Sequence, residues 1–239
     1  WKKLLYPYGA LLAVYVFLLA KEPHNSAIII TCGIGLIMLI AAGLRIWFLI
    51  PAGILAALGA FASYLTFEHV RNRVNIWLDP FSDMRDTGFQ AAMGQIAIGS
   101  GGFAGKGYLM GTQTKGNFVP EQHTDFIFST LGEEWGFFGA AGVVVLYALF
   151  LIQIVRVAAR QRTLFARNYG WCGFSVFFFH FLVNVGMAVG LLPVIGIPLP
   201  FFSYGGSSLW SFTILLFILV KLDAHRRDVL PEVSHFEDR

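Results

Sequence analysis

Six long apolar stretches recur along this 239-residue chain, and they constrain its fold more than any other feature. A helix needs about 20 mainly apolar residues to cross a bilayer. Charged residues make up only 13% of the chain, against roughly a quarter in a typical soluble domain. We therefore predict an all-α integral membrane protein with about six spans. The predicted spans are Leu4–Ala20, Ser26–Ala42, Ile46–Phe67, Trp135–Val155, Asn168–Gly190 and Phe201–Leu222.

Basic residues gather in alternate connections between the predicted spans. Short cytoplasmic loops of membrane proteins carry an excess of Lys and Arg, so this alternation predicts that both ends lie inside. The connections at 21–25, 68–134 and 191–200 then lie outside. The residues that mark the cytoplasmic side are Lys2, Lys3, Arg45, Arg156, Arg160, Arg162, Arg167, Lys221, His225, Arg226 and Arg227.

The predicted chain has four parts. Residues 1–67 hold three spans, residues 68–134 form a large extracytoplasmic loop, residues 135–222 hold three more spans, and residues 223–239 form a cytoplasmic tail. A Pro/Gly-rich outer loop at 191–208 interrupts the second set of spans. A loop of more than 60 residues is too long to lack structure. Because the chain starts at Trp1 without an initiator Met, we expect it to be a piece of a longer protein.

Composition also limits the partners of the chain. A net charge of +3 is too small to suggest nucleic acid. Both cysteines, Cys32 and Cys172, fall inside apolar runs and are interpreted as small buried hydrophobic residues. The sequence has no cluster with metal-ligand spacing.

Polar and ionisable residues crowd into one stretch, Phe118–Glu134, which reads FVPEQHTDFIFSTLGEE. Carboxylates at the mouth of a membrane span are unfavourable unless they are hydrated, paired or functional. The alternative is an ordinary solvated loop in which Asp125 or Thr124 caps the next helix. Glu133 and Glu134 are expected to be charges at a helix N-terminus or partners of loop arginines.

Two glycine-rich stretches flank this polar segment in the sequence. Gly99–Gly107 reads GSGGFAGKG, and its backbone N–H groups with Lys106 would suit a phosphate, although a flexible turn is the more common explanation. It is not a P-loop, because no Gly-Lys-Ser/Thr closes it. Gly190–Ser208 contains three prolines, so it is irregular backbone that must face protein or a wet cavity. A rigid turn with Ser203 or Ser207 as a helix cap is the alternative.

Two other segments of the large region carry expectations. Thr87–Ser100 has helical periodicity, as an interfacial helix or as a packed or re-entrant one. His180 and Asn184 are four residues apart and share a helix face, where interhelical hydrogen bonds are the favoured explanation.

These strings, in this order, resemble the SEDS family (shape, elongation, division and sporulation), which includes FtsW, RodA and SpoVE. The most specific matches are VPEQHTDFIFSTLGEEWGFFG from Val119 and PLPFFSYGGSS from Pro198, and the resemblance runs from about Glu22 to Arg227. The family has ten membrane helices, so the resemblance implies that this chain supplies the last six. One departure is the connection at 22–26, which reads EPHNS where the family often has QPDLG.

The resemblance implies a peptidoglycan glycosyltransferase that polymerises lipid II during division, elongation or sporulation. It also implies a bacterial cytoplasmic membrane, an active site on its outer face, and a class B penicillin-binding protein as partner. The family's essential aspartate falls on Asp125, the expected catalytic base. The expected substrate-binding residues are Lys106, Glu121, His123, Thr124, Arg73, Ser203 and Ser207.

The chemistry of the residues is compatible with this role. A sugar hydroxyl that attacks an anomeric carbon must lose its proton to a base, for which Asp125 is suitably placed. The departing lipid diphosphate needs positive charge, with Lys106, Lys115, Arg71 and Arg73 as candidates. A divalent cation such as Mg²⁺ or Mn²⁺ could share that task. An apolar groove walled by the Phe-rich fifth span would take the lipid tail.

Two other functions stay open at this level. A flippase for a lipid-linked sugar would place polar groups near the membrane midplane, where this chain has little beyond His180 and Asn184. A non-catalytic membrane scaffold of the division complex is the second alternative.

Overall fold

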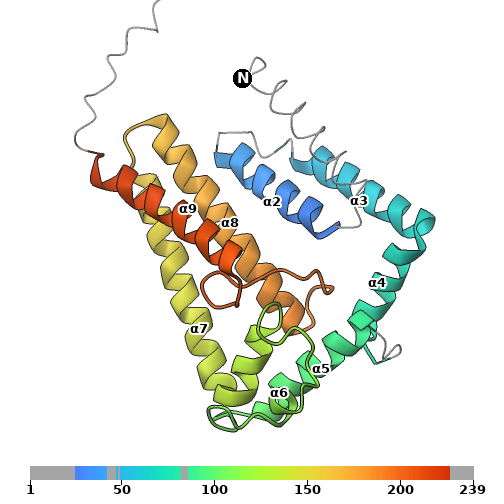
Figure 1. Cartoon of the computed structure of the whole chain (residues 1–239). Coiled ribbons are helices and arrows are strands. Elements are labelled where there is room, and N and C mark those ends of the chain that lie inside the picture. Colours follow the sequence, from blue (N-terminus) through green and yellow to red (C-terminus); the bar gives the residue numbers. More distant parts are fainter. Residues whose placement is uncertain (1–24, 42–46, 48, 82–85, 227–239) are drawn as a thin grey trace, which may run out of the picture.

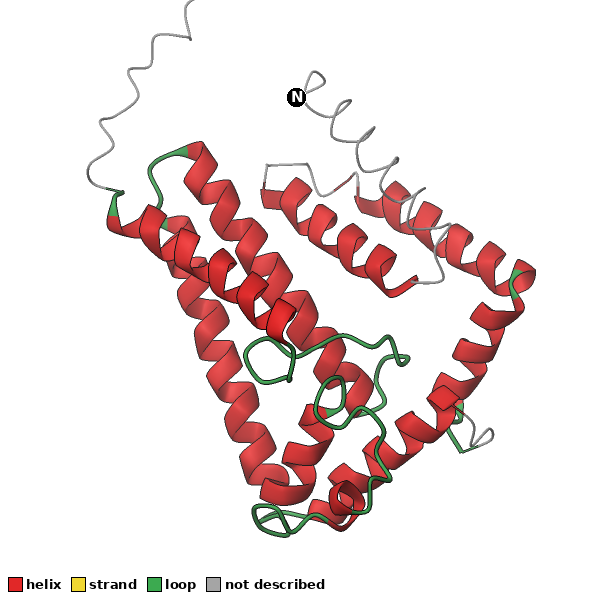
Figure 2. Ribbon diagram, in the orientation of Figure 1, coloured by secondary structure: helices red, strands yellow, loops and turns green. Residues whose placement is uncertain are grey.

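The computed structural model describes residues 25–41, 47, 49–81 and 86–226, and this part of the chain consists of helices and loops (Figure 2). The predicted span Leu4–Ala20, most of the departure at 22–26 and the tail beyond Arg226 lie outside the described residues. The helices are α2 (Asn25–Ala41), α3 (Leu49–Thr66), α4 (Glu68–Leu78), α5 (Asp86–Gly101), α6 (Thr112–Lys115), α7 (Ile127–Ala159), α8 (Leu164–Ala188) and α9 (Gly206–Ala224).

Three of these helices, α7, α8 and α9, are long and apolar enough to cross a membrane. They coincide with the fourth, fifth and sixth predicted spans. The second and third predicted spans are also helical in the described part of the chain, as α2 and α3 with 17 and 18 residues. Within the described residues, the structure therefore supports three of the predicted spans by length and composition.

Helix α8 is the centre of the helical assembly, because α2, α7 and α9 all pack against it (Figure 1). Its phenylalanines explain this position, since large rings bury the most apolar area. Phe177 is fully buried and stacks on Phe201, with ring centroids 5.6 Å apart. The cluster of buried residues around it consists of Leu151, Ile154, Phe177, Phe212 and Leu219.

The long region between α3 and α7 contains α4, α5 and α6. The predicted helix Thr87–Ser100 is confirmed as α5, which packs against α7 and buries Ala91, Ala92 and Ala97. These contacts agree with the packed form expected for this helix. Small buried residues let α5 approach α7 closely.

A kink at Gly136 divides α7 into a short part before the apolar run and a long part within it (Figure 1). Gly136 has φ 65° and ψ −163°, a backbone conformation that residues with a side chain rarely adopt. A Cβ atom at this position would also lie 2.3 Å from the backbone nitrogen of Gly105. Two loop carbonyls accept hydrogen bonds from the backbone just after the kink. Phe137 N–H donates to Gly102 O at 2.8 Å, and Phe138 N–H donates to Phe103 O at 3.2 Å.

The predicted start of the last span, Phe201, is wrong by five residues. Helix α9 begins at Gly206, and Phe201 has φ 63°, which is incompatible with a helix. Residues 201–205 form a loop instead, in which Phe201 and Phe202 stay 41% and 44% exposed while the Phe201 ring packs on Phe177. Three prolines within 193–200 exclude a regular helix there.

Candidate functional site

Asp125 lies at the end of the turn that precedes α7. The residue at the N-cap of α7 is Phe126, and no side chain caps this helix end, so the alternative in which Asp125 or Thr124 is a helix cap is wrong. Phe126 is 1% exposed and packs with Ala97 of α5 and Val119. This buried ring anchors the turn and leaves the neighbouring Asp125 partly exposed.

The polar turn and the Pro/Gly-rich loop are joined by hydrogen bonds. Ser203 Oγ donates to Thr124 O at 2.5 Å and accepts from Leu199 N–H at 2.7 Å. Tyr204 N–H donates to His123 O at 2.8 Å. The Pro/Gly-rich loop therefore lies directly against the turn that carries Asp125. Ser203 does not cap α9, whose N-cap is Gly205.

Asn184 fastens both loops to the end of α8. Its Nδ2 donates to Asp125 O at 2.8 Å and to Ile197 O at 2.7 Å, and its side chain is fully buried. The favoured expectation of interhelical bonds is wrong for Asn184, because its partners are loop carbonyls. His180 bonds within its own helix, to Val176 O at 2.8 Å. The spacing of His180 and Asn184 predicts that they share a helix face, but it contains no information about which loop carbonyls Asn184 bonds.

The carboxylate of Asp125 is half-buried and receives no hydrogen bond from the described part of the chain. A Cβ atom at Gly196 would lie 3.2 Å from Asp125 Oδ2, so the loop backbone closes one side of the carboxylate. Burial, and secondarily the charge of Glu121, raise the pKa of Asp125. The direction of this shift, which was left open by the sequence, favours a stronger base than an aspartate in water.

Glu121, His123 and Thr124 line one surface pocket of about 390 Å³, together with Tyr204 from the other loop. Thr124 Oγ1 donates to Glu121 Oε2 at 2.9 Å. The structure thus brings together three of the predicted substrate-binding residues beside Asp125. The remaining lining residues are Asn117, Val119, Pro120 and Gln122.

Lys106 has a different environment from the one expected. Its Nζ donates to Glu133 Oε1 at 2.8 Å, to Ser100 Oγ at 2.7 Å and to Thr112 Oγ1 at 2.7 Å. An ammonium group has three hydrogens, and all three have internal acceptors. The ammonium group of Lys106 is therefore used inside the protein, and a diphosphate would have to displace one of these acceptors.

Glu133 is fully buried and explains the position of Lys106. Its carboxylate also accepts from the second and third backbone N–H groups of α6, Gln113 N at 2.8 Å and Thr114 N at 3.0 Å. The sequence predicted that Glu133 would pair with a loop arginine or lie at the N-terminus of its own helix. Instead, Glu133 caps α6 and pairs with Lys106. A buried carboxylate is tolerated because it is both paired and hydrogen-bonded.

The glycine-rich stretch does not form a cradle for an anion. Lys106 N–H and Gly107 N–H donate to Glu133 O and Glu134 O, both at 3.0 Å, and Gly105 N–H donates to Gly101 O at 2.9 Å. The glycines instead permit close contact with the kinked start of α7. The phosphate interpretation of this stretch is therefore corrected to a packing role.

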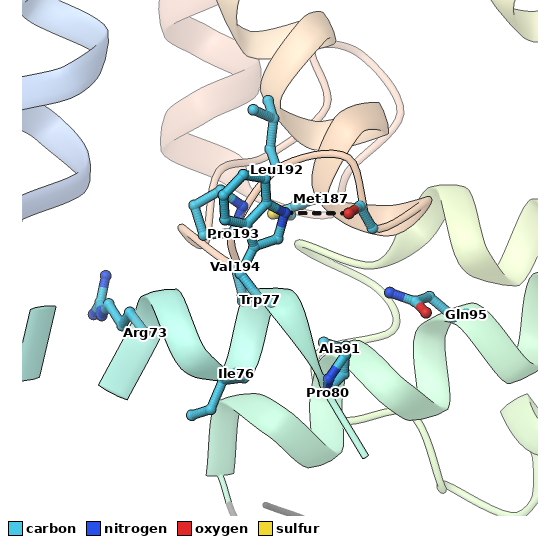
Figure 3. A pocket seen from close by; sticks show the side chains of 11 residues that line it. Arg73, Ile76, Trp77, Pro80, Ala91, Gln95, Met187, Leu192, Pro193 and Val194 are labelled. Carbon is cyan, nitrogen blue, oxygen red and sulfur yellow. Dashed lines mark hydrogen bonds between the residues drawn. The ribbon is translucent and has the colours of Figure 1, made fainter. Parts of the chain in front are cut away.

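Arg73 lines a different cavity from the pocket beside Asp125. Figure 3 shows it on α4, on the opposite side of the view from Gln95, with Trp77 between them. These residues line a space of about 10 Å³, room for one water, and Trp77 Nε1 donates to Gly190 O at 3.2 Å. Ser207 is exposed in the first turn of α9, and its carbonyl accepts from Ser211 Oγ at 2.9 Å.

An apolar groove of about 630 Å³ runs along the kink of α7. Its walls come from the end of α5, from both sides of Gly136, and from Val185 of α8 and Val189, the C-cap of that helix. The fifth predicted span thus contributes to the groove through Val185 and Val189, whereas Phe174, Phe177, Phe178 and Phe181 pack in a separate cluster. The described residues include no group of three His, Cys, Asp or Glu side chains that could hold a metal ion.

Comparison with known sequences gives consistent matches. The profile of the FtsW/RodA/SpoVE family, described as "Cell cycle protein", matches residues 1–228. The chain is 40% identical to peptidoglycan glycosyltransferase MrdB of Escherichia coli K12, over 88% of the chain and 57% of that protein. It is 37% identical to the probable peptidoglycan glycosyltransferase FtsW of Tolumonas auensis, over 92% of the chain and 58% of that protein. The chain thus spans little more than half the length of these relatives.

Solved structures give the same assignment. One is described as "Structural coordination of polymerization and crosslinking by a peptidoglycan synthase complex"; its matched chain has a TM-score of 0.78 and 30% identity, over 93% of this chain and 62% of that one. A mutant of the rod shape determining protein RodA from Thermus thermophilus has a TM-score of 0.56 and 26% identity, over 91% of this chain and 57% of that one. The chain belongs to the FtsW/RodA/SpoVE, or SEDS, family of multi-pass membrane proteins.

Proposed function

We propose that this chain is the part of a peptidoglycan glycosyltransferase that carries its catalytic base, Asp125. The observation that carries the proposal is the environment of this carboxylate. It is half-buried, its pKa is raised, and no described group donates to it. A base with these properties is free to accept a proton from a substrate hydroxyl.

The proposed reaction joins two lipid-linked sugars. A sugar hydroxyl attacks the anomeric carbon of the other sugar, and Asp125 takes the hydroxyl proton. The bond from the anomeric carbon to the lipid diphosphate breaks, and its electron pair leaves with the diphosphate. Polar groups of Glu121, His123 and Thr124 in the adjoining pocket would orient the sugars.

The lipid part of the substrate requires an apolar site. We assign it to the groove along the kink of α7, which opens beside the start of an apolar helix. The departing diphosphate needs positive charge, for which Arg71, Arg73 and the exposed Lys115 are the remaining candidates of this region.

We further propose lipid II as the substrate and a class B penicillin-binding protein as the partner, in the cytoplasmic membrane with Asp125 on the outer side. Support comes from the relatives, which are named peptidoglycan glycosyltransferases, and from the similar chain in a peptidoglycan synthase complex. Names from both the MrdB and FtsW groups occur among them, so the cellular process is division, elongation or sporulation.

Polymerisation of labelled lipid II by the purified protein tests the proposal, with glycan strands resolved by length. Because the chain spans part of its relatives, the same assay is run on a chimaera in which it replaces the matched part of E. coli MrdB. Strand formation by either protein supports a glycosyltransferase. Transfer of labelled lipid across vesicles without strands would indicate a flippase, and inactivity of both proteins, when folded and complexed with their partner, would indicate a scaffold.

A further inference from the structure

A second pocket lies at the opposite end of the spanning helices from Asp125. It is formed where α7 ends, α8 begins and α9 ends (Figure 1). Its volume is about 390 Å³. The function proposed above makes no use of it. Its lining residues are Gln161, Arg162, Thr163, Ala166, Ile218, Lys221, Leu222, His225 and Arg226.

The polar side of this pocket is basic. Arg162, Lys221, His225 and Arg226 line it, and none of the described lining residues is acidic. Among the described residues, the carboxylate that bonds this basic group is that of Asp223. Arg226 Nη1 donates to it at 2.8 Å, as does Arg160 Nε. Within the described part of the chain, one carboxylate between two arginines leaves a positive charge uncompensated, in addition to those of Arg162 and Lys221.

The geometry of the pocket is fixed by the same acidic residue. Arg160 and Gln161 at the end of α7 both donate to Asp223 of α9, Gln161 Nε2 at 3.1 Å. Thr163 is the N-cap of α8, and its Oγ1 accepts from Ala166 N–H at 3.2 Å. The positive end of the α8 dipole therefore adds to the charge of the side chains.

The other side of the pocket is apolar. Ala166, Ile218 and Leu222 form it. It continues onto a face of α9 where Ile214, Phe217 and Ile218 are 52%, 65% and 42% exposed. A free anion would gain nothing from this apolar surface, whereas an acyl chain attached to a phosphate would bury it.

We propose that this pocket binds the head group of an anionic phospholipid, of the phosphatidylglycerol type, with an acyl chain along α9. Basic pockets between membrane helices are a recurrent form of lipid head-group site. The shared chemistry is a phosphate, and the apolar continuation selects the lipid over a free anion. A zwitterionic head group would bind more weakly, because its own cation compensates the phosphate.

Native mass spectrometry of the full chain in detergent tests the proposal, with phosphatidylglycerol and phosphatidylcholine of identical acyl chains. We expect bound phosphatidylglycerol to survive at activation energies that remove phosphatidylcholine. Millimolar inorganic phosphate should leave the phosphatidylglycerol adduct in place. Equal retention of the two lipids, or displacement by phosphate, overturns the proposal without any variant.

A double variant, Arg162→Gln with Lys221→Gln, locates the site. Each charge near a membrane surface contributes about fivefold in affinity, so the apparent affinity for phosphatidylglycerol should fall about 25-fold. The matched control, Arg156→Gln with Arg167→Gln, removes two exposed charges at the same end that do not line the pocket. An equal loss in the control, or no loss in the pocket variant with unchanged thermal unfolding, would contradict the assignment.

Discussion

The side chain of Asn184 holds the backbone of Asp125, since its Nδ2 donates to the Asp125 carbonyl at 2.8 Å. The same nitrogen also donates to Ile197 O at 2.7 Å, so one buried amide joins α8 to both loops of the candidate site. Because the carboxylate of Asp125 has no donor of its own among the described residues, its position depends on its backbone. Asn184 thus positions the proposed base without touching the substrate.

Replacing Asn184 tests this link. Asn184→Ala leaves two carbonyls without their donor, which costs about 1–3 kcal/mol each when they stay buried. The melting temperature should fall, and kcat for polymerisation should fall more than KM rises. The control is Ser175→Ala, because Ser175 is equally buried on α8 but bonds within its own helix, to Trp171 O. Equal kinetic effects of the two variants would show that Asn184 only supports the fold.

Lys106 is expected to contribute to stability. Lys106→Met removes the partner of a fully buried carboxylate, and breaking such a pair typically destabilises by about 3–5 kcal/mol. Thermal unfolding should show a large loss, and Glu133→Gln added to this variant should restore part of it. Lys115→Met, at an exposed lysine of α6, is the control and should have little effect. A normally stable Lys106→Met protein with a raised KM would reinstate Lys106 as a substrate ligand.

The helices were predictable because apolar length alone determines where a chain can cross a membrane. The second part of α7, α8 and most of α9 follow from it. The first residue of α9 was not predictable, because the apolar run continues back to Phe201. Phe201 is excluded from the helix by its backbone conformation, which the apolar pattern does not reveal. The kink at Gly136 likewise depends on a contact with Gly105, 31 positions earlier.

The candidate site was predictable in its residues but not in its connections. Crowded polar groups before an apolar helix marked Asp125, Glu121, His123 and Thr124. The partner of Lys106 lies 27 residues away, and sequence spacing contains no signal for such a pair. Free N–H groups were expected in a glycine-rich stretch, yet these groups bond the first part of α7. Tertiary contacts decided each case.

The membrane orientation can be measured with single cysteines. After Cys32 and Cys172 are replaced by Ser, cysteines at the exposed positions Lys115 and Arg167 should react with an impermeant reagent from opposite sides. Lys115 should react from outside in intact cells, because alternate loops carry the basic residues. Reaction of both positions from the same side would refute the proposed topology.

The charge of Glu121 should set part of the pH dependence. Asp125 acts as a base only when ionised, so activity should fall as the pH drops through its raised pKa. Glu121→Gln removes one cause of the raised value, and the acidic limb of the kcat/KM profile should move to lower pH. Glu68→Gln, at an exposed glutamate of α4, is the control. If the acidic limb does not move, then either Glu121 does not affect the pKa of Asp125, or Asp125 is not the base that titrates in this limb.

Lipid II polymerisation by Asp125→Asn protein is the most direct measurement of the central claim. The substitution keeps the shape of the side chain and its backbone bond from Asn184, but removes the base. We predict that kcat falls about 10²–10⁴-fold, while thermal stability and assembly with the partner are retained. Polymerisation at a rate near that of the unmodified protein would contradict the proposed mechanism.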